Sequence, residues 1–285
     1  MTVPAPLGIT GSTGHLGGRI VRLLSAAGVE QRLVVRDPDR APALPGCTPV
    51  QAQYDDFDAV RRAVDGLETL LMVSFSESAT RLAQHKTFVD AAADAGVAHL
   101  VYTSFIGADP GSTFTLARDH SATEGFIRES GMGFTFLRDN LYADFVPMMT
   151  DADGVIRGPA GTGRVAAVAQ DDIAAVAASV LTDPGAHRGA TYDLTGPEAL
   201  TLNEVAAVVH RVTGRPCTFH DETLEEAYAS RASYGAPDWQ VEAWVSTYTA
   251  IASGELAAVS PDVERVTGRA ATALEELLSV PGALG

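Results

Sequence analysis

Three glycines near the start of the chain are spaced as in phosphate-binding turns, within the stretch Gly11-Ser12-Thr13-Gly14-His15-Leu16-Gly17. The apolar run Leu7 to Thr10 precedes them, and a segment of helical period, His15 to Ala27, follows. In a strand, glycine turn and helix of this kind, the first glycine permits the turn and the second leaves room for a pyrophosphate. The third lets the helix pack on the sheet. We therefore expect a dinucleotide here, against the alternative of a glycine turn that only packs.

Arg36 follows the second expected strand, Arg32 to Val35. An acidic residue at this place binds the ribose hydroxyls of NAD, whereas an arginine can bind the 2′-phosphate of NADP bidentately. The residues therefore favour NADP(H) as the cofactor, with Arg40 as a second cation. Two alternatives remain open, because Arg36 could be a solvated surface side chain and Asp37 could bind the ribose diol.

The lysine content excludes one common mechanism of ketone reduction. Ordinary short-chain dehydrogenases pair a catalytic tyrosine with a lysine four residues later, which lowers the pKa of the phenol. This chain has a single lysine, Lys86, and Leu82 stands four residues before it. The Tyr-xxx-Lys pair is therefore absent, and the reaction must obtain its proton elsewhere.

The elements that position these residues alternate between short apolar runs and longer amphipathic segments, as in βα units around a parallel sheet. The expected strands are Leu7 to Thr10, Arg32 to Val35, Pro49 to Gln51, Thr69 to Val73, His99 to Thr103 and Thr135 to Leu137. The expected helices between them are His15 to Ala27, Phe57 to Val64, Ala79 to Ala95 and His120 to Ser130. The sequence thus predicts an α/β fold with a doubly wound parallel Rossmann sheet.

The alternation of strands and helices ends after Arg138. The glycine-rich stretch from Gly154 to Gly163 then predicts loops. Helical segments then predominate, with one more strand expected at Thr191 to Leu194. These helices are Asp172 to Leu181, Leu202 to Val212, Leu224 to Ala229, Val241 to Ala252 and Ala273 to Leu278. We predict an NADP-binding Rossmann domain over residues 1–150, with returning segments from the second half, and a smaller, mainly helical substrate or lid region over residues 151–285.

The composition excludes several classes of function. Hydrophobic residues at 46% and charged residues at 20% indicate a folded globular chain. A formal net charge of −16 disfavours nucleic-acid binding, which depends on cationic contacts to phosphates. Cys47 and Cys217 form no CxxC pair, and Asp55, Asp56 and Asp58 resemble a helix start, so no metal site is expected. The chain has no cationic leader and no apolar run of roughly 20 residues, so we expect it to be cytoplasmic and not inserted in a membrane. A homo-oligomer is compatible with the sequence.

Several motifs in a particular order resemble the NmrA-like family of atypical short-chain dehydrogenases, and within it the bacterial NADPH:quinone oxidoreductases. They are the glycine loop, Val35-Arg36-Asp37-Pro38, Tyr102-Thr103-Ser104, Leu137-Arg138-Asp139-Asn140-Leu141-Tyr142 and Val263-Glu264-Arg265-Val266-Thr267-Gly268-Arg269. The resemblance covers nearly the whole chain. It implies cofactor contacts at Gly11 through Leu16, Arg36, Ser74-Phe75-Ser76, Thr103-Ser104 and Arg138 to Tyr142, the last group near the nicotinamide. Gln53 departs from the aspartate that relatives often carry, and Asp56 is expected to cap the next helix.

The resemblance also implies a histidine followed four residues later by glutamate, which here are His120 and Glu124. Helical spacing would place both on one face, so that Glu124 orients the imidazole and raises its pKa. His120 is therefore the first candidate for a proton donor, against the alternative of a surface histidine. Tyr142 and Ser104 are further candidates, although Ser104 could instead cap a turn, and Asn140 suits binding better than acid catalysis. Tyr102 could likewise be a core residue.

The function implied by the resemblance is hydride transfer from NADPH to a small aromatic substrate, a quinone in the first hypothesis. A quinone suits a site without the Tyr-Lys pair, because its hydroquinone anion needs less acid assistance than an alkoxide. A second hypothesis is an NADP(H) sensor without turnover, and a third is a reductase of an aromatic natural product or an azo group. Six aromatic residues are candidates for a flat pocket or for the core: Phe75, Phe105, Phe145, Tyr234, Trp239 and Trp244.

Overall fold

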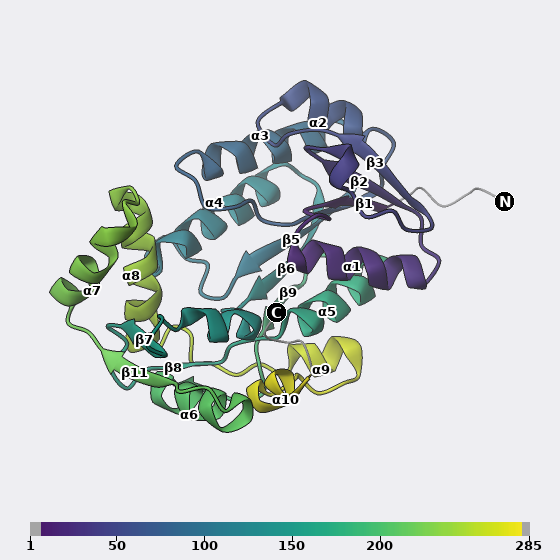
Figure 1. Cartoon of the computed structure of the whole chain (residues 1–285). Coiled ribbons are helices and arrows are strands. Elements are labelled where there is room, and N and C mark those ends of the chain that lie inside the picture. Colours follow the sequence, from purple (N-terminus) through teal and green to yellow (C-terminus); the bar gives the residue numbers. More distant parts are fainter. Residues whose placement is uncertain (1–6, 281–285) are drawn as a thin grey trace. The chain divides into compact units, whose positions relative to one another are not determined.

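The computed structural model describes residues 7–280, and the first six residues, in which the sequence predicts no export signal, lie outside the described residues. Its central sheet has the strand order β3-β2-β1-β4-β5-β6-β9 (Figure 1). The neighbouring pairs β1–β2, β2–β3, β1–β4 and β4–β5 run parallel. The predicted doubly wound Rossmann sheet is confirmed, and the order in which the strands are added reverses between β1 and β4. The strands are β1 (Leu7–Thr10), β2 (Gln31–Val35), β3 (Cys47–Gln51), β4 (Thr69–Met72), β5 (His99–Phe105), β6 (Gly133–Asp139) and β9 (Thr191–Leu194).

Helices cover both faces of this sheet, which explains why β4 and β5 are apolar runs buried along their whole length. Figure 1 shows α1 (His15–Ala26) and α5 (Gln170–Thr182) on one face. The other face carries α2 (Phe57–Val64), α3 (Arg81–Asp94) and α4 (Thr115–Glu129). Fully buried side chains such as Phe88 of α3 and Phe136 of β6 join these helices to the sheet in one core cluster.

Aspartates cap the two elements that follow β2 and β3. The Asp56 carboxylate accepts a hydrogen bond of 2.9 Å from the backbone of Ala59, which confirms the predicted cap of α2. Asp37 caps the 3₁₀ turn η1 (Pro38–Arg40) by accepting from the backbone of Asp39 at 3.1 Å. The exposed Asp37 side chain thus has a local structural partner in the turn.

The chain divides into two compact units, each made of three segments. The first unit comprises residues 1–104, 119–138 and 173–192 and contains most of the central sheet. The second comprises residues 105–118, 139–172 and 193–285. The segments alternate along the chain, and the functional division at residue 150 stays a prediction.

The second unit is mainly helical around its own apolar core. The helices and 3₁₀ turns that complete the fold are η2 (Ala143–Met149), α6 (Leu202–Thr213), α7 (Leu224–Arg231), η3 (Ala232–Tyr234), α8 (Asp238–Ala252), α9 (Asp262–Thr267) and α10 (Leu274–Ser279). Both α6 and α7 begin with capping boxes, at Thr201 and Thr223. The glycine-rich stretch, predicted as loops, instead contains β7 (Val155–Gly158), which pairs in parallel with β11 (Thr218–Asp221). The short strands β8 (Arg164–Val165) and β10 (Leu200–Thr201) pair antiparallel.

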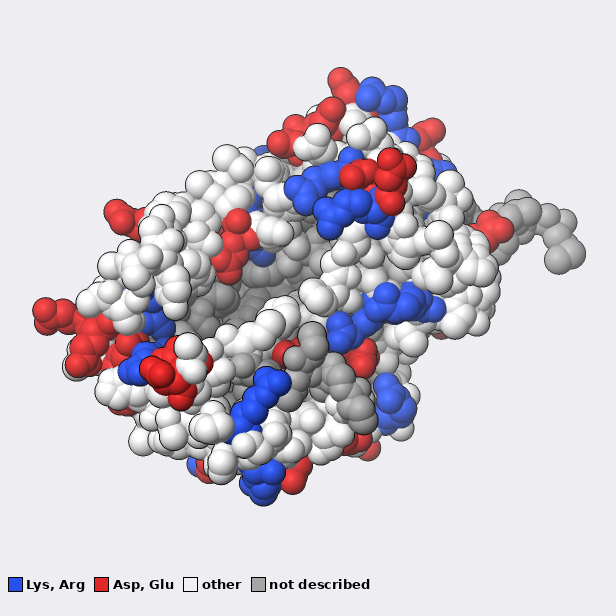
Figure 2. All heavy atoms as spheres, in the orientation of Figure 1, with Lys and Arg blue, Asp and Glu red and all other residues white. Residues whose placement is uncertain are grey.

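Charged side chains are spread in small groups over the surface in view. Figure 2 shows Lys and Arg separated by acidic and uncharged residues on this face. Within residues 7–280, no helix is long and apolar enough to cross a membrane. Nor do three or more His, Cys, Asp or Glu side chains of the described chain gather as they would around a metal ion.

Candidate functional site

The glycine loop connects β1 to α1 with the geometry that the sequence predicts. Gly11 has a φ of +66°, a left-handed conformation that favours glycine. A Cβ on Gly17 would lie 2.2 Å from the carbonyl oxygen of Gly11, so only glycine lets the helix approach the turn. A Cβ on Gly14 would meet nothing nearer than 3.3 Å. The protein's own packing therefore requires the glycine at 17, whereas the lack of a side chain at 14 leaves space outside the loop.

Two further observations fit a phosphate at this loop. No side chain caps the N-terminus of α1, so its first amides have no partner from a cap. The hydroxyl of Ser12 is buried without a hydrogen-bond partner, which leaves one more donor beside those amides. Thr13 and His15 are exposed, and the Leu16 side chain is buried in the core. The donor set fits a pyrophosphate held by the backbone and Ser12.

Arg36 follows β2 and lies on the surface with its guanidinium carbon 5.8 Å from the centroid of the Phe75 ring. Its backbone carbonyl accepts from the Gln51 side-chain amide at 3.0 Å. A guanidinium binds phosphate and carboxylate oxygens through its N–H edges, so contact with an aromatic ring is compatible with phosphate binding. This arrangement brings together two of the residues predicted to contact the cofactor, one after β2 and one after β4.

The segment Ser74-Phe75-Ser76 leaves the carboxyl end of β4, next to β1 in the sheet. The buried hydroxyl of Thr103 on β5 accepts a 2.8 Å hydrogen bond from the backbone of Ser74. Thr103, predicted as a cofactor contact, therefore also supports the loop. Ser74 and Phe75 are half-buried and Ser76 is exposed, so this loop lies at the edge where ligands of doubly wound sheets bind.

His120 is buried, contrary to the alternative of a surface histidine. Its Nε2 lies 3.0 Å from a guanidinium nitrogen of Arg81, and its Nδ1 lies 2.9 Å from the hydroxyl of Tyr102. Burial first, and then the nearby Arg81, hold the pKa of His120 well below its usual range. The expectation that Glu124 raises this pKa was wrong, because a neighbouring cation and a dry environment both disfavour the imidazolium. The role of His120 as proton donor stays a prediction.

Glu124 has different partners. Arg138 donates two hydrogen bonds to its carboxylate, at 2.8 and 2.7 Å, and the Ser104 hydroxyl donates at 2.7 Å. Arg128 adds a third cationic contact at 3.0 Å. Bidentate pairing with a guanidinium offsets part of the cost of burying a carboxylate. Glu124 thus brings together Ser104 and Arg138, two predicted site residues whose contact with a ligand stays a prediction.

Asp139, the last residue of β6, and Asn140, which follows it, have contrasting surroundings. Asn140 is buried and donates to the carbonyl of Leu256 at 3.0 Å, while its side-chain oxygen accepts from the backbone of Leu141. Asp139 is also buried, but only one of its carboxylate oxygens has a partner, the Tyr142 hydroxyl at 3.1 Å. Burial raises the pKa of Asp139 well above its usual range. The sequence did not single out this carboxyl, since nothing in a lone aspartate reveals its burial.

A pH-dependent stability follows from Asp139. Because its pKa is higher in the folded than in the unfolded chain, the folded state binds the proton more tightly, and stability falls as pH rises from about 4 through the folded pKa. We expect Asp139→Asn to remove this decline and to be more stable than the wild type above that range, by about 1.4 kcal/mol for each pKa unit of elevation. Urea unfolding at a series of pH values measures it. Asp94→Asn, at an exposed carboxylate paired with Arg61, is the control and should change little. Parallel pH curves for Asp139→Asn and the wild type would contradict the assignment.

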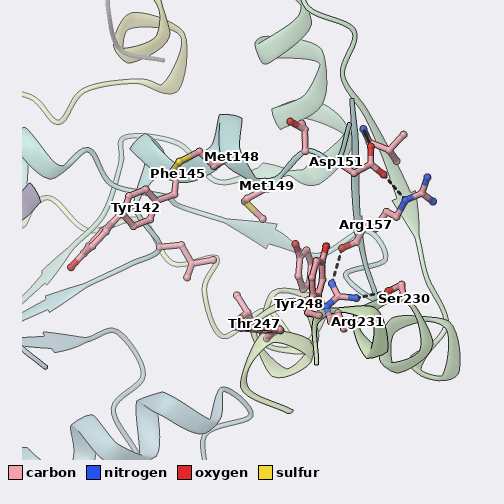
Figure 3. A pocket seen from close by; sticks show the side chains of 15 residues that line it. Tyr142, Phe145, Met148, Met149, Asp151, Arg157, Ser230, Arg231, Thr247 and Tyr248 are labelled. Atoms are coloured by element: carbon pink, nitrogen blue, oxygen red, sulfur yellow. Dashed lines mark hydrogen bonds and ion pairs between the residues drawn. The ribbon is translucent and has the colours of Figure 1, made fainter. Parts of the chain in front are cut away.

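The second unit contains a cavity of about 660 Å³, shown in Figure 3. Its first lining residue, Leu141, directly follows Asn140 in the chain. Its lining is mostly apolar and aromatic, and the side chains come from η2, β7, α7, η3 and α8. The lining residues are Leu141, Tyr142, Phe145, Met148, Met149, Thr150, Asp151, Val155, Arg157, Ser230, Arg231, Tyr234, Trp244, Thr247 and Tyr248. Three of the six aromatics proposed for a flat pocket line it: Phe145, Tyr234 and Trp244. Phe105 instead stacks on Phe114 in the core.

The polar side chains of this cavity are paired. Arg231 donates to Glu222 at 2.9 Å and to the carbonyl of Arg157 at 2.9 Å, and its guanidinium carbon lies 5.1 Å from the centroid of the Tyr248 ring. Arg157 in turn bonds Asp151 at 2.8 Å (Figure 3). No sequence motif marks these residues, and the hydrogen bond from Arg231 to the Arg157 carbonyl joins segments far apart in the chain. A cavity with satisfied charges and a broad aromatic lining suits a flat, largely uncharged ligand.

Comparison with known proteins agrees with the site. A family model described as NAD(P)H-binding matches residues 11–184. Quinone oxidoreductase 2 of Escherichia coli is 34% identical over 96% of this chain and 97% of its own, and an NAD(P)H azoreductase of Xenophilus azovorans is 32% identical over 94% and 95%. The crystal structure of an Escherichia coli NADPH-dependent quinone oxidoreductase with NADPH superimposes with a TM-score of 0.88, at 33% identity over 96% of this chain and 98% of that one.

These matches confirm the predicted resemblance to the bacterial quinone oxidoreductases of the NmrA-like family. The family match begins at Gly11, the first residue of the glycine loop, and runs through α5, so it includes the loop, Arg36 and the segment after β4. The chain therefore belongs to the NAD(P)H-binding family.

Proposed function

We propose that this protein is an NADPH-dependent reductase that transfers hydride to a quinone-like aromatic substrate. The observation that carries the proposal is the aromatic and methionine-lined cavity of the second unit, in a chain that also has a dinucleotide loop. The similarity to a quinone oxidoreductase and an azoreductase over almost the whole chain supports the same class of substrate.

We assign cofactor binding to the first unit. The amides of the glycine loop and the Ser12 hydroxyl would hold the pyrophosphate, and Arg36 would hold the 2′-phosphate that distinguishes NADPH from NADH. Bound NADPH would supply the hydride. The second unit would take the substrate, so that the predicted division into cofactor and substrate regions follows the two units rather than a single boundary at residue 150.

The proton needed to complete quinone reduction would come from Tyr142. This tyrosine lines the cavity, and its hydroxyl lies 3.1 Å from the buried Asp139 carboxyl, which can orient it. Neither condition is met by His120, whose two ring nitrogens already have partners within the first unit. The hydride and the Tyr142 proton together convert a quinone to a hydroquinone, and solvent restores the phenol proton.

We expect Tyr142→Phe to lower turnover about tenfold while leaving NADPH affinity unchanged. General acids commonly contribute about 100-fold or more, but a hydroquinone anion needs less assistance, which reduces the expected loss. Steady-state rates and a separate NADPH titration measure the two effects. Tyr228→Phe, at an exposed tyrosine outside the cavity, is the matched control. Full turnover in Tyr142→Phe would make solvent the proton source.

The function itself is tested by mixing purified protein with NADPH and a panel of quinones and azo dyes, and following the loss of NADPH absorbance. Turnover with quinones supports the proposal, and turnover with azo compounds alone would move the substrate to that class. Tight NADPH binding without turnover on any member of the panel would favour a redox sensor, a role that the missing Tyr-Lys pair also permits.

A further inference from the structure

Phe75 is held at both of its backbone polar atoms by side chains of α3. Its N–H donates to Nε2 of His85 at 2.9 Å, and its carbonyl accepts from Nε of Arg81 at 2.9 Å. Both side chains are buried, although arginine and histidine are costly to bury without partners. Both polar groups of the Phe75 backbone are therefore held by buried side chains. A loop that only connected β4 to α3 would not require these two contacts.

The two holding side chains are themselves fixed by α4 and β5. His85 Nδ1 lies 2.9 Å from the hydroxyl of Thr123, which donates its own proton to the carbonyl of Asp119. Nδ1 of His85 must therefore carry the ring proton, and Nε2 is free to accept from Phe75. Burial first, and then Arg81, lower the pKa of His85 to about 2, so the ring stays a neutral acceptor.

Arg81 is fixed in the same way. Its guanidinium, which can only donate, reaches Nε2 of His120 at 3.0 Å. His120 then donates from Nδ1 to the Tyr102 hydroxyl at 2.9 Å, and Asp119 lies 3.4 Å from Arg81. These contacts form a buried network between α3, α4 and β5, and outside those elements it contacts the backbone N–H and C=O of Phe75.

The ring of Phe75 stands between a buried tyrosine and Arg36. The Tyr54 ring centroid lies 5.2 Å from that of Phe75, and the Tyr54 hydroxyl donates to the carbonyl of Val73 at 2.8 Å. On the surface, the Arg36 guanidinium carbon is 5.8 Å from the Phe75 centroid. An exposed arginine otherwise samples many rotamers, and contact with an aromatic face reduces that freedom.

We propose that Arg81 and His85 are positioning residues for cofactor selectivity: by fixing Phe75 they hold Arg36 in place for the 2′-phosphate. The inference rests on the proposed function, because it takes Arg36 as the ligand of that phosphate. It assigns to α3 a role in choosing between NADPH and NADH, although neither residue would contact the cofactor. A network that only stabilised the fold would affect both cofactors alike.

The test measures the dissociation constants of NADPH and NADH for His85→Leu. We expect a three- to tenfold weaker affinity for NADPH, the range of a lost cation–π arrangement, and less than about a twofold change for NADH. In an Arg36→Ala background, His85→Leu should have no further effect on NADPH, because the side chain that it positions is gone. His99→Leu is the matched control, since His99 is another buried histidine of this unit and bonds Thr135 at 2.9 Å. It should lower stability and leave the ratio of the two constants unchanged.

A second pair of variants keeps the test decisive if circular dichroism shows that His85→Leu does not fold. Phe75→Leu should reproduce the loss of selectivity, and Phe75→Tyr, which keeps an aromatic face, should restore it. Equal losses for NADPH and NADH, or effects of His85→Leu and Arg36→Ala that simply add, would overturn the positioning role. If the wild type itself binds NADPH no more tightly than NADH, the assignment of Arg36 fails instead, so the two failures are distinguishable.

Discussion

Gly14→Val is expected to abolish NADPH binding while the protein remains folded. The backbone at residue 14, with φ −91° and ψ 173°, is extended and accessible to valine, and its Cβ would approach only the Gly11 carbonyl, at 3.3 Å. The branched methyl groups would then fill the space outside the loop, where the amides of α1 are open. Loss of two or more charge-assisted hydrogen bonds, each worth about 1.5 to 3 kcal/mol, weakens affinity by at least about 100-fold.

The contrast with Gly17→Ala makes this prediction specific. Its Cβ would lie 2.2 Å from the Gly11 carbonyl oxygen, so even one methyl group must distort the turn and lower the thermal unfolding temperature. Gly14→Val should lower the free energy of unfolding by at most about 1 kcal/mol, because valine is a poor N-cap residue. Circular dichroism melts and a fluorescence titration with NADPH separate the two variants. Normal NADPH binding by a folded Gly14→Val protein would remove the loop from the site.

Arg36→Ala is expected to weaken NADPH binding by about 10- to 100-fold and to change NADH binding little. The guanidinium would pair with the 2′-phosphate, a charge-assisted contact worth on the order of 1.5 to 3 kcal/mol that NADH does not offer. Isothermal titration calorimetry with each cofactor gives the ratio of the NADPH and NADH dissociation constants directly. The measurement belongs at moderate salt, since an exposed charge pair is screened at high ionic strength.

Arg40→Ala is the natural control for Arg36→Ala. Arg40 is the last residue of the turn η1, is exposed, and was predicted only as a second cation. We expect Arg40→Ala to weaken NADPH binding by about threefold or less, because an exposed cation away from the 2′-phosphate attracts it only weakly. An equal loss of NADPH and NADH affinity in Arg36→Ala would show that this arginine supports the loop rather than the 2′-phosphate.

The central sheet was predictable because its signals are local. The strands β1, β4 and β5 are apolar runs buried on both faces, and glycines follow the helices between them. The pair β7 and β11 was missed for the opposite reason. Thr218–Asp221 is a largely exposed strand of mixed polarity whose only partner lies in a distant segment, and no local pattern reveals such a pairing.

The geometry of the glycine loop could be predicted, since the spacing of its glycines matches the turn after β1 and the close approach of α1; its contacts with the cofactor stay a prediction. The surroundings of His120 could not be predicted. The i, i+4 spacing correctly placed Glu124 one turn away, but it could not show that Arg81 from another helix supplies the partner of the imidazole. Burial of Asp139 and the hydrogen bond from Arg231 to the Arg157 carbonyl likewise depend on tertiary packing, which residue types alone do not specify.

The alternation of the two units along the chain has a consequence for how such a protein can be divided or recombined. Each unit takes three separate stretches of sequence, and the first unit receives residues 173–192 only after two segments of the second, 105–118 and 139–172, have been synthesised. Cutting the gene at residue 150 would therefore leave an N-terminal fragment without β9, an edge strand of its sheet, and without α5. Neither half is a transferable module, so new substrate specificity in this architecture is expected to arise by substitution within the cavity rather than by exchange of a whole domain.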